Sequence, residues 1–199
     1  SSLVLIPSGT KTSKVYSQVP TNGDGDFDFT RSTAATRVNA DGNIEKETSN
    51  LLVRSNDFDN WNSSVSVSFT SGQSGYNGTN DAWKIDLTAA AGRVQNSNST
   101  SGVHTFSLYA KAGTLNWVRM ITNSASTQDM FFDLANGVLG TSTYGGQIDA
   151  TITSVGSGWY RCTLTDDKEL YNIRIYPAQG NGDITATSGS VYIQDAQLN

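Results

Sequence analysis

The sequence predicts an all-β protein, an antiparallel sandwich or barrel, and three observations support this. Charged residues make up only 16% of the chain and glycine occurs 19 times, which suits a protein with many turns. Short alternating segments recur after residue 50 with turn residues between them. No stretch has the apolar spacing of an amphipathic helix.

Residues 1–49 are expected to form an irregular, extended arm. They contain Pro7 and Pro20 and too few periodic apolar residues for a core of their own. We expect a hairpin across the turn Asp41-Gly42. Residues 22–28 (NGDGDFD) alternate acids with other residues as calcium loops do, but an ordinary acidic turn is the favoured interpretation, because no glutamate closes the loop. Such an arm should be stable only when packed on its own sandwich or on a neighbouring subunit.

The expected strands of the sandwich are short, and they span residues 65–69, 82–87, 103–110, 115–121, 129–134, 148–155, 159–165, 170–176 and 190–198. Side chains alternate across a strand, so one face of each should be buried. That face carries Val118, Met120, Met130, Phe132, Leu134, Ile152, Tyr160, Cys162, Leu164, Ile173, Ile175, Val191 and Ile193. The opposite face carries Tyr109, Trp117, Arg119, Trp159, Arg161, Asn172, Arg174 and Tyr176.

The aromatic and basic residues of this outer face are candidates for carbohydrate binding. Flat rings stack on the apolar face of a pyranose, and arginine donates several hydrogen bonds to hydroxyls or carboxylates. Large exposed aromatic patches are uncommon on monomers, however, so we favour the alternative that a loop, the arm or a partner subunit covers this face. The candidate carbohydrate-binding residues are Tyr109, Trp117, Arg119, Arg174 and Tyr176.

Charge and cysteine content exclude several classes. The net charge of −5 argues against nucleic-acid binding, which normally shows a basic face, and no run of Lys or Arg is present to bind anionic lipid. No apolar stretch is long enough to insert into a membrane. Cys162 is the only cysteine, so no disulfide can form within the chain, and its strand position predicts a buried, unreactive thiol.

The sequence offers little for catalysis, and we expect no enzymatic activity. His104 is the only histidine, and no Gly-x-Ser-x-Gly motif accompanies it. Glycoside cleavage needs two carboxyl groups facing each other across a sugar, and the pairs Asp166 with Asp167 and Asp129 with Asp133 could supply them only if the fold placed them so. No glycine-rich phosphate-binding motif is present.

Several segments resemble bacteriophage tail, fibre and other virion proteins. Residues 50–61 (NLLVRSNDFDNW) match the opening of their β-sandwich domains. Further matches in the sandwich and the arm are residues 106–113 (FSLYAKAG), 158–162 (GWYRC), 191–198 (VYIQDAQL), 7–9 (PSG), 25–27 (GDF), 29–31 (FTR), 36–39 (TRVN) and 42–45 (GNIE).

The chain is also similar to carbohydrate-binding modules with a jelly-roll fold. This resemblance narrows the expected fold to an antiparallel jelly-roll β-sandwich over residues 50–199, preceded by the arm over residues 1–49. Such modules often hold one structural calcium ion near their terminal strands, and by position Asp59 and Asp195 would be its carboxylate ligands. Gln194 stands where those modules have a second acid.

The resemblances imply a non-enzymatic structural protein on a virion surface, part of the tail, a fibre or a capsid decoration, and outside the cell. Its sandwich would bind host or environmental glycans, pack into a homo-oligomer, or contact other virion proteins, and copy number would strengthen weak attachment. The alternative is a carbohydrate-binding module of a secreted polysaccharide-degrading enzyme. A lyase or depolymerase is the third possibility. Fold resemblance alone decides none of these.

Overall fold

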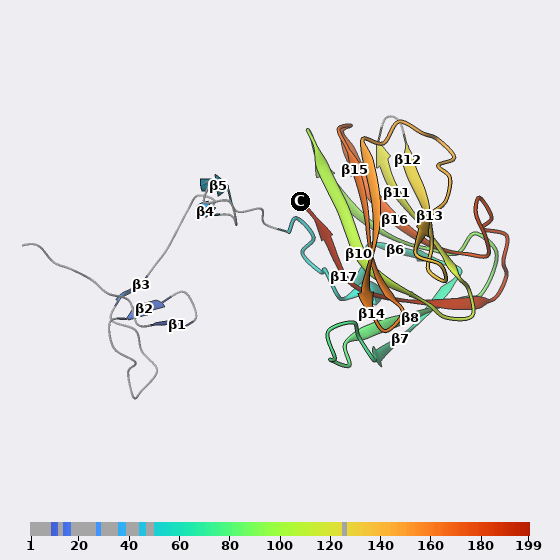
Figure 1. Cartoon of the computed structure of the whole chain (residues 1–199), viewed down its shortest axis with the longest axis horizontal. Helices are drawn as coiled ribbons and strands as arrows, with labels where there is room; N and C mark the ends of the chain where they lie inside the picture. Colours follow the sequence, from blue (N-terminus) through green and yellow to red (C-terminus); the bar gives the residue numbers. More distant parts are fainter. Residues whose placement is uncertain are drawn as a thin grey trace, which may run out of the picture. The chain divides into compact units, whose positions relative to one another are not determined.

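Residues 50–199 fold into two six-stranded antiparallel sheets that face each other (Figure 1). Sheet 1 contains, in spatial order, β14 (Asp149–Gly156), β15 (Trp159–Asp166), β10 (His104–Ala112), β17 (Gly189–Leu198), β8 (Ala82–Leu87) and β7 (Val67–Gln73). Sheet 2 contains β13 (Val138–Leu139), β12 (Gln128–Asp133), β11 (Trp117–Ser124), β16 (Leu170–Ala178), β9 (Arg93–Thr100) and β6 (Ser63–Val65). Successive strands repeatedly change sheet, a connectivity of the jelly-roll type, so the predicted fold class is confirmed.

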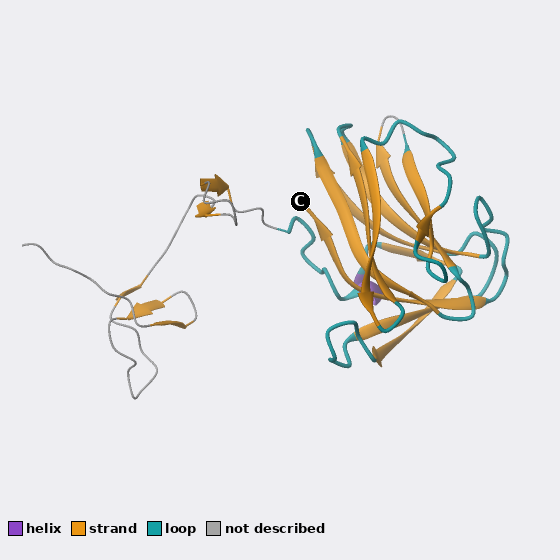
Figure 2. Ribbon diagram, viewed as in Figure 1, coloured by secondary structure: helices purple, strands orange, loops and turns teal. Residues whose placement is uncertain are grey.

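This computed structural model describes residues 50–124 and 127–199, together with the backbone of five short strands before residue 50. In the described part of the sandwich the helical structure is one short 3-10 segment, η1 (Phe58–Asn60), and Figure 2 shows strands and loops around it. None of the described helical segments has the length and hydrophobicity needed to cross a bilayer.

The chain divides into two compact units, Ser1–Ser49 and Asn50–Asn199. In the first unit, β1 (Gly9–Lys11), β2 (Lys14–Tyr16) and β3 (Phe27–Asp28) form a small antiparallel sheet, and β4 (Thr36–Val38) pairs with β5 (Ile44–Lys46). β4 and β5 flank the predicted turn Asp41-Gly42, which lies outside the described residues. The acidic turn expected at residues 22–26 lies outside the described residues, and the role of the arm in assembly stays a prediction.

The core lies between the two sheets and uses the strand faces that alternation predicted. Val118, Met120, Phe132, Ile173 and Ile175 of sheet 2 are fully buried or nearly so. All the other predicted inward residues are buried as well, except Ile152 and Tyr160, which are partly exposed but pack against the same cluster. At about 25 cal/mol per Å² of apolar surface, this continuous core is the main source of stability.

One predicted strand is two strands in different sheets. The alternation over residues 65–69 predicted a single strand, but β6 ends at Val65 and β7 begins at Val67. Between them Ser66 has a positive φ of 55°, a left-handed conformation that strands do not contain. Its carbonyl oxygen accepts a hydrogen bond from the Thr88 N–H at 2.9 Å, which fixes the turn. The chain therefore changes sheet at Ser66.

The prediction missed β9 because its sequence, RVQNSNST, is almost entirely polar. Only Val94 and Asn96 are buried in it. The strand exists because β16 pairs with it along one edge and β6 along the other, which satisfies its backbone groups. Tertiary pairing here overrides a weak local preference.

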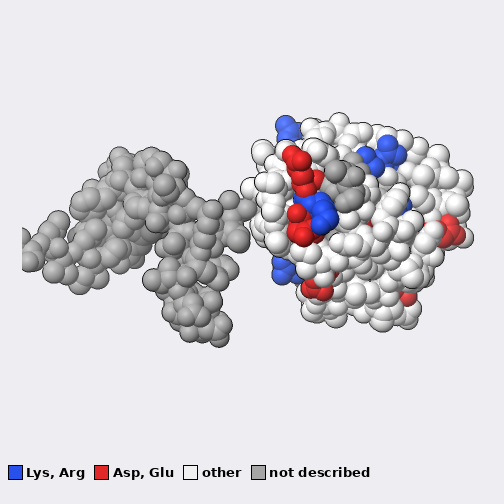
Figure 3. Space-filling model, turned by 90° about the horizontal axis from the view of Figure 1, so that it is seen from above, with Lys and Arg blue, Asp and Glu red and all other residues white. Residues whose placement is uncertain are grey.

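Charged side chains are sparse on the surface of the sandwich drawn in Figure 3, which is largely uncharged with small groups of acidic and basic residues. This agrees with the charged fraction of 16% for the whole chain. That face offers no broad basic surface of the kind that binds nucleic acid.

Substitutions at Ser66 should separate strand propensity from backbone strain. Ser66→Val should lower the free energy of unfolding by about 1–2 kcal/mol, because a β-branched residue is disfavoured at positive φ. Ser66→Gly should leave it unchanged or raise it. Urea denaturation of both variants measures the difference, and equal midpoints for Val and Ser would contradict the left-handed turn.

Candidate functional site

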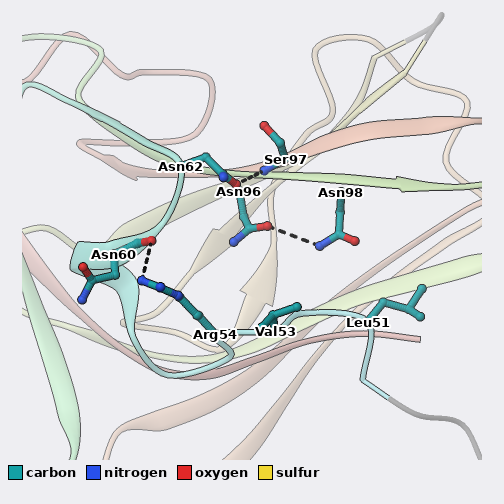
Figure 4. A pocket seen from close by; sticks show the side chains of 8 residues that line it. All are labelled: Leu51, Val53, Arg54, Asn60, Asn62, Asn96, Ser97 and Asn98. Atoms are coloured by element: carbon teal, nitrogen blue, oxygen red, sulfur yellow. Dashed lines mark hydrogen bonds between the residues drawn. The ribbon is translucent and has the colours of Figure 1, made fainter.

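A pocket of about 340 Å³ opens at the edge of the sandwich, between the segment that follows Asn50 and strand β9 (Figure 4). We call it the asparagine pocket, because amide side chains dominate its lining. The lining residues are Leu51, Val53, Arg54, Asn60, Asn62, Asn96, Ser97 and Asn98. Figure 4 shows Asn96 and Asn98 projecting from β9 toward the segment that carries Val53 and Arg54.

The side chain of Asn50 fixes the start of this segment to the last strand of the sandwich. Its Oδ1 accepts hydrogen bonds from the N–H groups of Leu52 and Leu198, both at 3.0 Å. Its Nδ2 donates to the carbonyl oxygen of Ala196 at 3.1 Å, and the Leu51 N–H donates to the Leu198 carbonyl oxygen at 2.8 Å. We call this set of bonds the Asn50 clamp. The clamp places Leu51 and Val53 beside β9, although this segment does not form a regular strand.

Two buried aromatic rings hold the other end of the segment. Phe58 is fully buried in η1, and its ring lies 5.0 Å from that of Trp61. The Trp61 Nε1–H donates to the carbonyl oxygen of Arg54 at 2.7 Å. The Arg54 guanidinium in turn donates to the carbonyl oxygen of Asn60 at 3.4 Å. Trp61 therefore holds the backbone of Arg54, and the exposed Arg54 side chain lines the pocket.

Charge at the mouth is balanced by Asp57. The Arg54 guanidinium lies 3.7 Å from the Asp57 carboxylate, and the Asn60 Nδ2 donates to the same carboxylate at 2.9 Å. The hydrogen bond from Asn60 chiefly, with a smaller contribution from Arg54, holds the pKa of Asp57 below its ordinary value. The pair is exposed, so its contribution to stability is small.

The amide groups of the pocket are only partly used by the protein itself. The Ser97 N–H donates to Asn62 Oδ1 at 2.7 Å, and Asn98 Nδ2 donates to Asn96 Oδ1 at 3.3 Å. These bonds orient the side chains. Within the described residues, Asn62 Nδ2, Asn96 Nδ2 and Asn98 Oδ1 have no protein partner. Two oriented donors and one acceptor therefore face the pocket.

Two exposed apolar side chains lie beside these polar groups. Val53 is 96% exposed and Leu51 is 40% exposed, although both come shortly after Asn50 in the sequence. Exposed apolar side chains next to oriented donors and acceptors match a ligand with an apolar face and a hydroxyl rim. Of the described residues that line the pocket, none is Asp, Glu, His or Cys.

Sequence reasoning did not find this pocket. The sequence did not indicate Asn62 or Asn98 as binding residues, and it did not predict β9 as a strand. The available indication was the recurrence of asparagine at residues 60 and 62 and again at 96 and 98. Pairing of β6 with β9 brings the two groups together, because Ser63 lies opposite Gln95.

The predicted carbohydrate-binding residues do not form one surface. Trp117 and Arg119 on β11 and Arg174 and Tyr176 on β16 lie on neighbouring strands of sheet 2, with Arg119 directly opposite Tyr176. Tyr109 lies on β10 in sheet 1. Arg119 and Tyr176 are each only 7% exposed, so they offer no open platform. Sugar binding by the partly exposed Trp117 and Arg174 stays a prediction, and Arg174 Nε already donates to Gln95 Oε1 at 2.7 Å.

Residues 141–147 cover this part of sheet 2. Asp129 on β12 is fully buried, and its Oδ1 accepts hydrogen bonds from the Ser142 hydroxyl and the N–H groups of Thr143 and Tyr144 at 2.8–3.0 Å. Its Oδ2 lies 2.7 Å from both Nε and a terminal nitrogen of Arg119. The residues on both faces of β12 are consequently buried.

Three aromatic rings surround the buried Arg119 guanidinium. Its carbon lies 5.2 Å from the centre of the Phe131 ring, 5.4 Å from Tyr144 and 5.8 Å from Tyr176. This is cation–π geometry, and it accounts for aromatic residues on the outer face without a ligand. Asp133 is also nearly buried, but its oxygens bind the backbone of Ala135 and Asn136, which shows a turn rather than a catalytic carboxyl pair with Asp129.

A second loop covers Tyr109 and Trp159 in sheet 1. The Tyr76 ring stacks on Tyr109 with centroids 3.6 Å apart, and it meets Trp159 edge-on at 6.5 Å. Trp159 is only 1% exposed, although alternation placed it on the outer face. Burial, with contributions from Tyr109 and Asp195, raises the pKa of Tyr76 far above its ordinary value.

The expected calcium ligands lie in different surroundings. Asp195 sits in a β-bulge of β17 with a positive φ of 48°, and its carboxylate accepts a hydrogen bond from the Tyr76 hydroxyl at 3.2 Å. Burial raises the pKa of Asp195, and Asp81 adds to the effect. Asp59 instead binds Asn60. Among the described residues, no contact joins Asp59 to Asp195 and no group of three or more His, Cys, Asp or Glu could hold a metal ion. Calcium binding by the pair stays a prediction.

The remaining candidates for chemistry are structural. His104 is 2% exposed, and its Nδ1 lies 2.9 Å from the Gly102 carbonyl oxygen. Asp166 is fully buried and accepts a hydrogen bond from the Thr122 hydroxyl, whereas Asp167 is exposed and pairs with Lys168, so the two carboxyls do not face each other. Burial raises the pKa of the Cys162 thiol, which keeps it protonated and unreactive at neutral pH.

Comparison with known proteins finds no matching family model and no matching curated protein. Among solved structures, the chain is similar to the carbohydrate-binding module TmCBM61 in complex with β-1,4-galactotriose (14% identity, 76% of this chain and 99% of that one, TM-score 0.44). It is also similar to the enzymatically active domain of tailspike protein 4 of bacteriophage CBA120 (13% identity, 75% of this chain and 21% of that one, TM-score 0.42). A third similar structure holds the CBM22-1 and GH10 modules of Clostridium thermocellum xylanase 10B complexed with xylohexaose (10%, 71% and 26%, 0.39). The chain spans about a fifth of the tailspike structure and about a quarter of the xylanase structure. At such identities, the functional residues of these proteins cannot be assigned to positions in this chain.

Removing the Asp129 charge should destabilise the fold strongly. Asp129→Asn leaves the Arg119 cation buried without its counter-ion, and we expect the free energy of unfolding to fall by about 3–5 kcal/mol. Urea denaturation checks this, with the exposed Asp149→Asn as the matched control, which should be neutral. An Asp129→Asn variant as stable as the control would contradict the assigned role.

The same carboxylate should contribute an acid-sensitive part of the stability. Burial acts to raise the pKa of Asp129, but the hydrogen bonds from Tyr144 and Ser142 and the Arg119 charge outweigh it, so the pKa lies below 3.8. A carboxyl group with a lowered pKa in the folded state stabilises the fold fully above its unfolded value and loses this contribution as pH falls through the folded value. Urea midpoints measured from pH 6 downward should therefore fall below about pH 4, and less steeply in Asp129→Asn.

Proposed function

We propose that this protein is a non-catalytic glycan-binding module that holds neutral sugars in the asparagine pocket. The observation that carries the proposal is the set of oriented amide groups, Asn62 Nδ2, Asn96 Nδ2 and Asn98 Oδ1, which have no partner among the described residues. Amides offer both donors and acceptors without charge, which matches sugar hydroxyls. The exposed Leu51 and Val53 would contact the apolar face of the sugar ring.

The size and composition of the pocket support binding without catalysis. At about 340 Å³ the pocket lies at the low end of ligand sites, roughly 300–1,000 Å³, and suits a short stretch of saccharide. Glycoside hydrolysis needs a pair of carboxyl groups across the scissile bond, and the described lining residues supply none. An open site with few polar groups binds weakly, so several copies acting together would give useful attachment.

We propose further that the protein works in several copies at a virion surface, with residues 1–49 as the assembly segment. The separation of the chain into two compact units supports this, because a glycan-binding sandwich needs no second unit to fold. The resemblance of the arm segments to virion proteins favours the same role. The second candidate, a carbohydrate-binding module of a secreted polysaccharide-degrading enzyme, shares the pocket and differs only in what the first unit joins.

Isosteric substitution tests the pocket without disturbing its internal bonds. Asn62→Asp and Asn96→Asp keep Oδ1, which accepts the bonds from Ser97 and Asn98, but replace the free Nδ2 donor by an acceptor. Each should weaken binding of a neutral oligosaccharide about tenfold, the effect of losing one hydrogen bond of roughly 1.4 kcal/mol. A glycan array with the wild-type protein identifies the ligand, and calorimetry measures the affinities.

Asn116→Asp is the matched control, because Asn116 is exposed, lies outside the pocket and undergoes the same change of charge. It should bind as the wild type does. Unaltered affinity in both pocket variants, with an array-positive ligand, would place the binding site elsewhere on the chain.

The mass of the protein in solution tests the assembly role. Light scattering should find a multimer for the whole chain and a monomer for residues 50–199, which carry their own core. A whole chain that remains monomeric over the accessible concentration range would contradict assembly through residues 1–49 and favour the module of a secreted enzyme.

A further inference from the structure

A second pocket, of about 270 Å³, lies on the outer face of sheet 1. It is lined by Gln73 at the end of β7, Ser74 in the loop that follows, Lys111 on β10 and Tyr192 on β17. We call it the lysine pocket. None of its lining residues belongs to the asparagine pocket, so the two surfaces are separate.

Strand register places Tyr192 between two lysines. Tyr192 lies directly opposite Lys111 on β10 and directly opposite Lys84 on β8. Directly paired residues of antiparallel strands project from the same face, so the tyrosine ring and both lysine side chains share the outer surface of sheet 1. Lys84 forms an ion pair with Asp86 at 2.7 Å. Lys111 lines the pocket and has no acidic partner among the described residues, so no ion pair balances its positive charge.

Hydrogen bonds from the fully buried Gln194 hold the loop that follows Ser74, which forms the neighbouring wall of the pocket. Gln194 Oε1 accepts a hydrogen bond from the Tyr76 N–H at 3.1 Å, and its Nε2 donates to the Asp81 carboxylate at 2.6 Å. A Cβ on Gly75 would lie 2.3 Å from Gln194 Oε1, so a larger residue there would require Gln194 to move. The loop thus stands in place before any ligand arrives, which lowers the entropic cost of binding.

We propose that the lysine pocket binds a negatively charged sugar unit. The Tyr192 ring would contact the apolar face of the pyranose, and the Lys111 ammonium would pair with its carboxylate or sulfate. Gln73 donates through Nε2 to the Ser71 carbonyl oxygen at 3.1 Å, which leaves its Oε1 for a sugar hydroxyl. The net charge of the chain is −5, so binding of an anionic glycan needs such a local positive group. This site goes beyond the proposed binding of neutral sugars and does not depend on it.

Matched ligands isolate the contribution of charge. Trigalacturonic acid and its methyl ester have the same rings, but only the acid is negatively charged. By calorimetry, the acid should bind the wild-type protein at least tenfold more tightly than the ester, as a charge-assisted hydrogen bond is worth about 1.5–3 kcal/mol. A sulfated carrageenan tetrasaccharide and its desulfated form repeat the comparison, and tighter binding of one anion type identifies the group that the pocket prefers.

Lys111→Met keeps most of the aliphatic stem and removes the charge. It should abolish the preference for the acid over the ester while leaving the thermal unfolding midpoint unchanged. Lys168→Met is the matched control, because Lys168 is exposed and already paired with Asp167, and it should preserve the preference. Equal binding of charged and uncharged forms of both ligands, or a preference that survives Lys111→Met, overturns the proposal. Asn62→Asp and Asn96→Asp should not alter the preference for the acid over the ester. The two proposed sites can therefore fail independently, and the experiments distinguish the two failures.

Discussion

The Asn50 clamp is the constraint on which the rest of the binding surface depends. One side chain accepts hydrogen bonds from Leu52 and Leu198 and donates one to Ala196, so it ties the first residues of the sandwich to its last strand. The segment that follows has no regular strand partner and still follows a fixed path, because Phe58 and Trp61 anchor its far end in the core. Without the Asn50 side chain, the N–H groups of the buried Leu52 and Leu198 would lose their acceptor. An unsatisfied buried N–H costs about 1–3 kcal/mol, and loss of the clamp would also release the wall of the asparagine pocket.

Loops determine which parts of the sandwich are accessible. Residues 141–147 cover the part of the outer face of sheet 2 that contains Asp129 and Arg119, and the loop containing Tyr76 covers Tyr109 and Trp159 in sheet 1. Arg119, Trp159 and Tyr176, which alternation placed on the outside, are thereby buried. The proposed binding sites instead use polar side chains, four asparagines at the edge of the sandwich and one lysine with a tyrosine on sheet 1.

The sequence predicted the fold well wherever burial imposes alternation. β11, β12, β15 and β17 lie within a few residues of their expected positions, and their inward residues are buried except for the partly exposed Tyr160. It failed where the reason is tertiary. β9 is polar and exists through pairing with β6 and β16, and Ser66 breaks an apparent strand with a backbone conformation that side-chain pattern does not encode. The asparagine pocket was invisible for the same reason, since its halves are more than thirty positions apart in sequence and meet only through the β6–β9 pairing. The covering of Arg119 was foreseen as one alternative, but the loop responsible was not.

The most direct test of the glycan-binding account is a nuclear magnetic resonance titration of the isotope-labelled protein with a neutral oligosaccharide identified on a glycan array. The side-chain amide signals of Asn62, Asn96 and Asn98 and the backbone signal of Ser97 should shift together with one dissociation constant, because these groups surround the asparagine pocket. Signals from Arg119 and Tyr176 should not move, as both residues are buried beneath their loop. Saturable shifts confined to another surface, with the asparagine signals unchanged, would contradict the account.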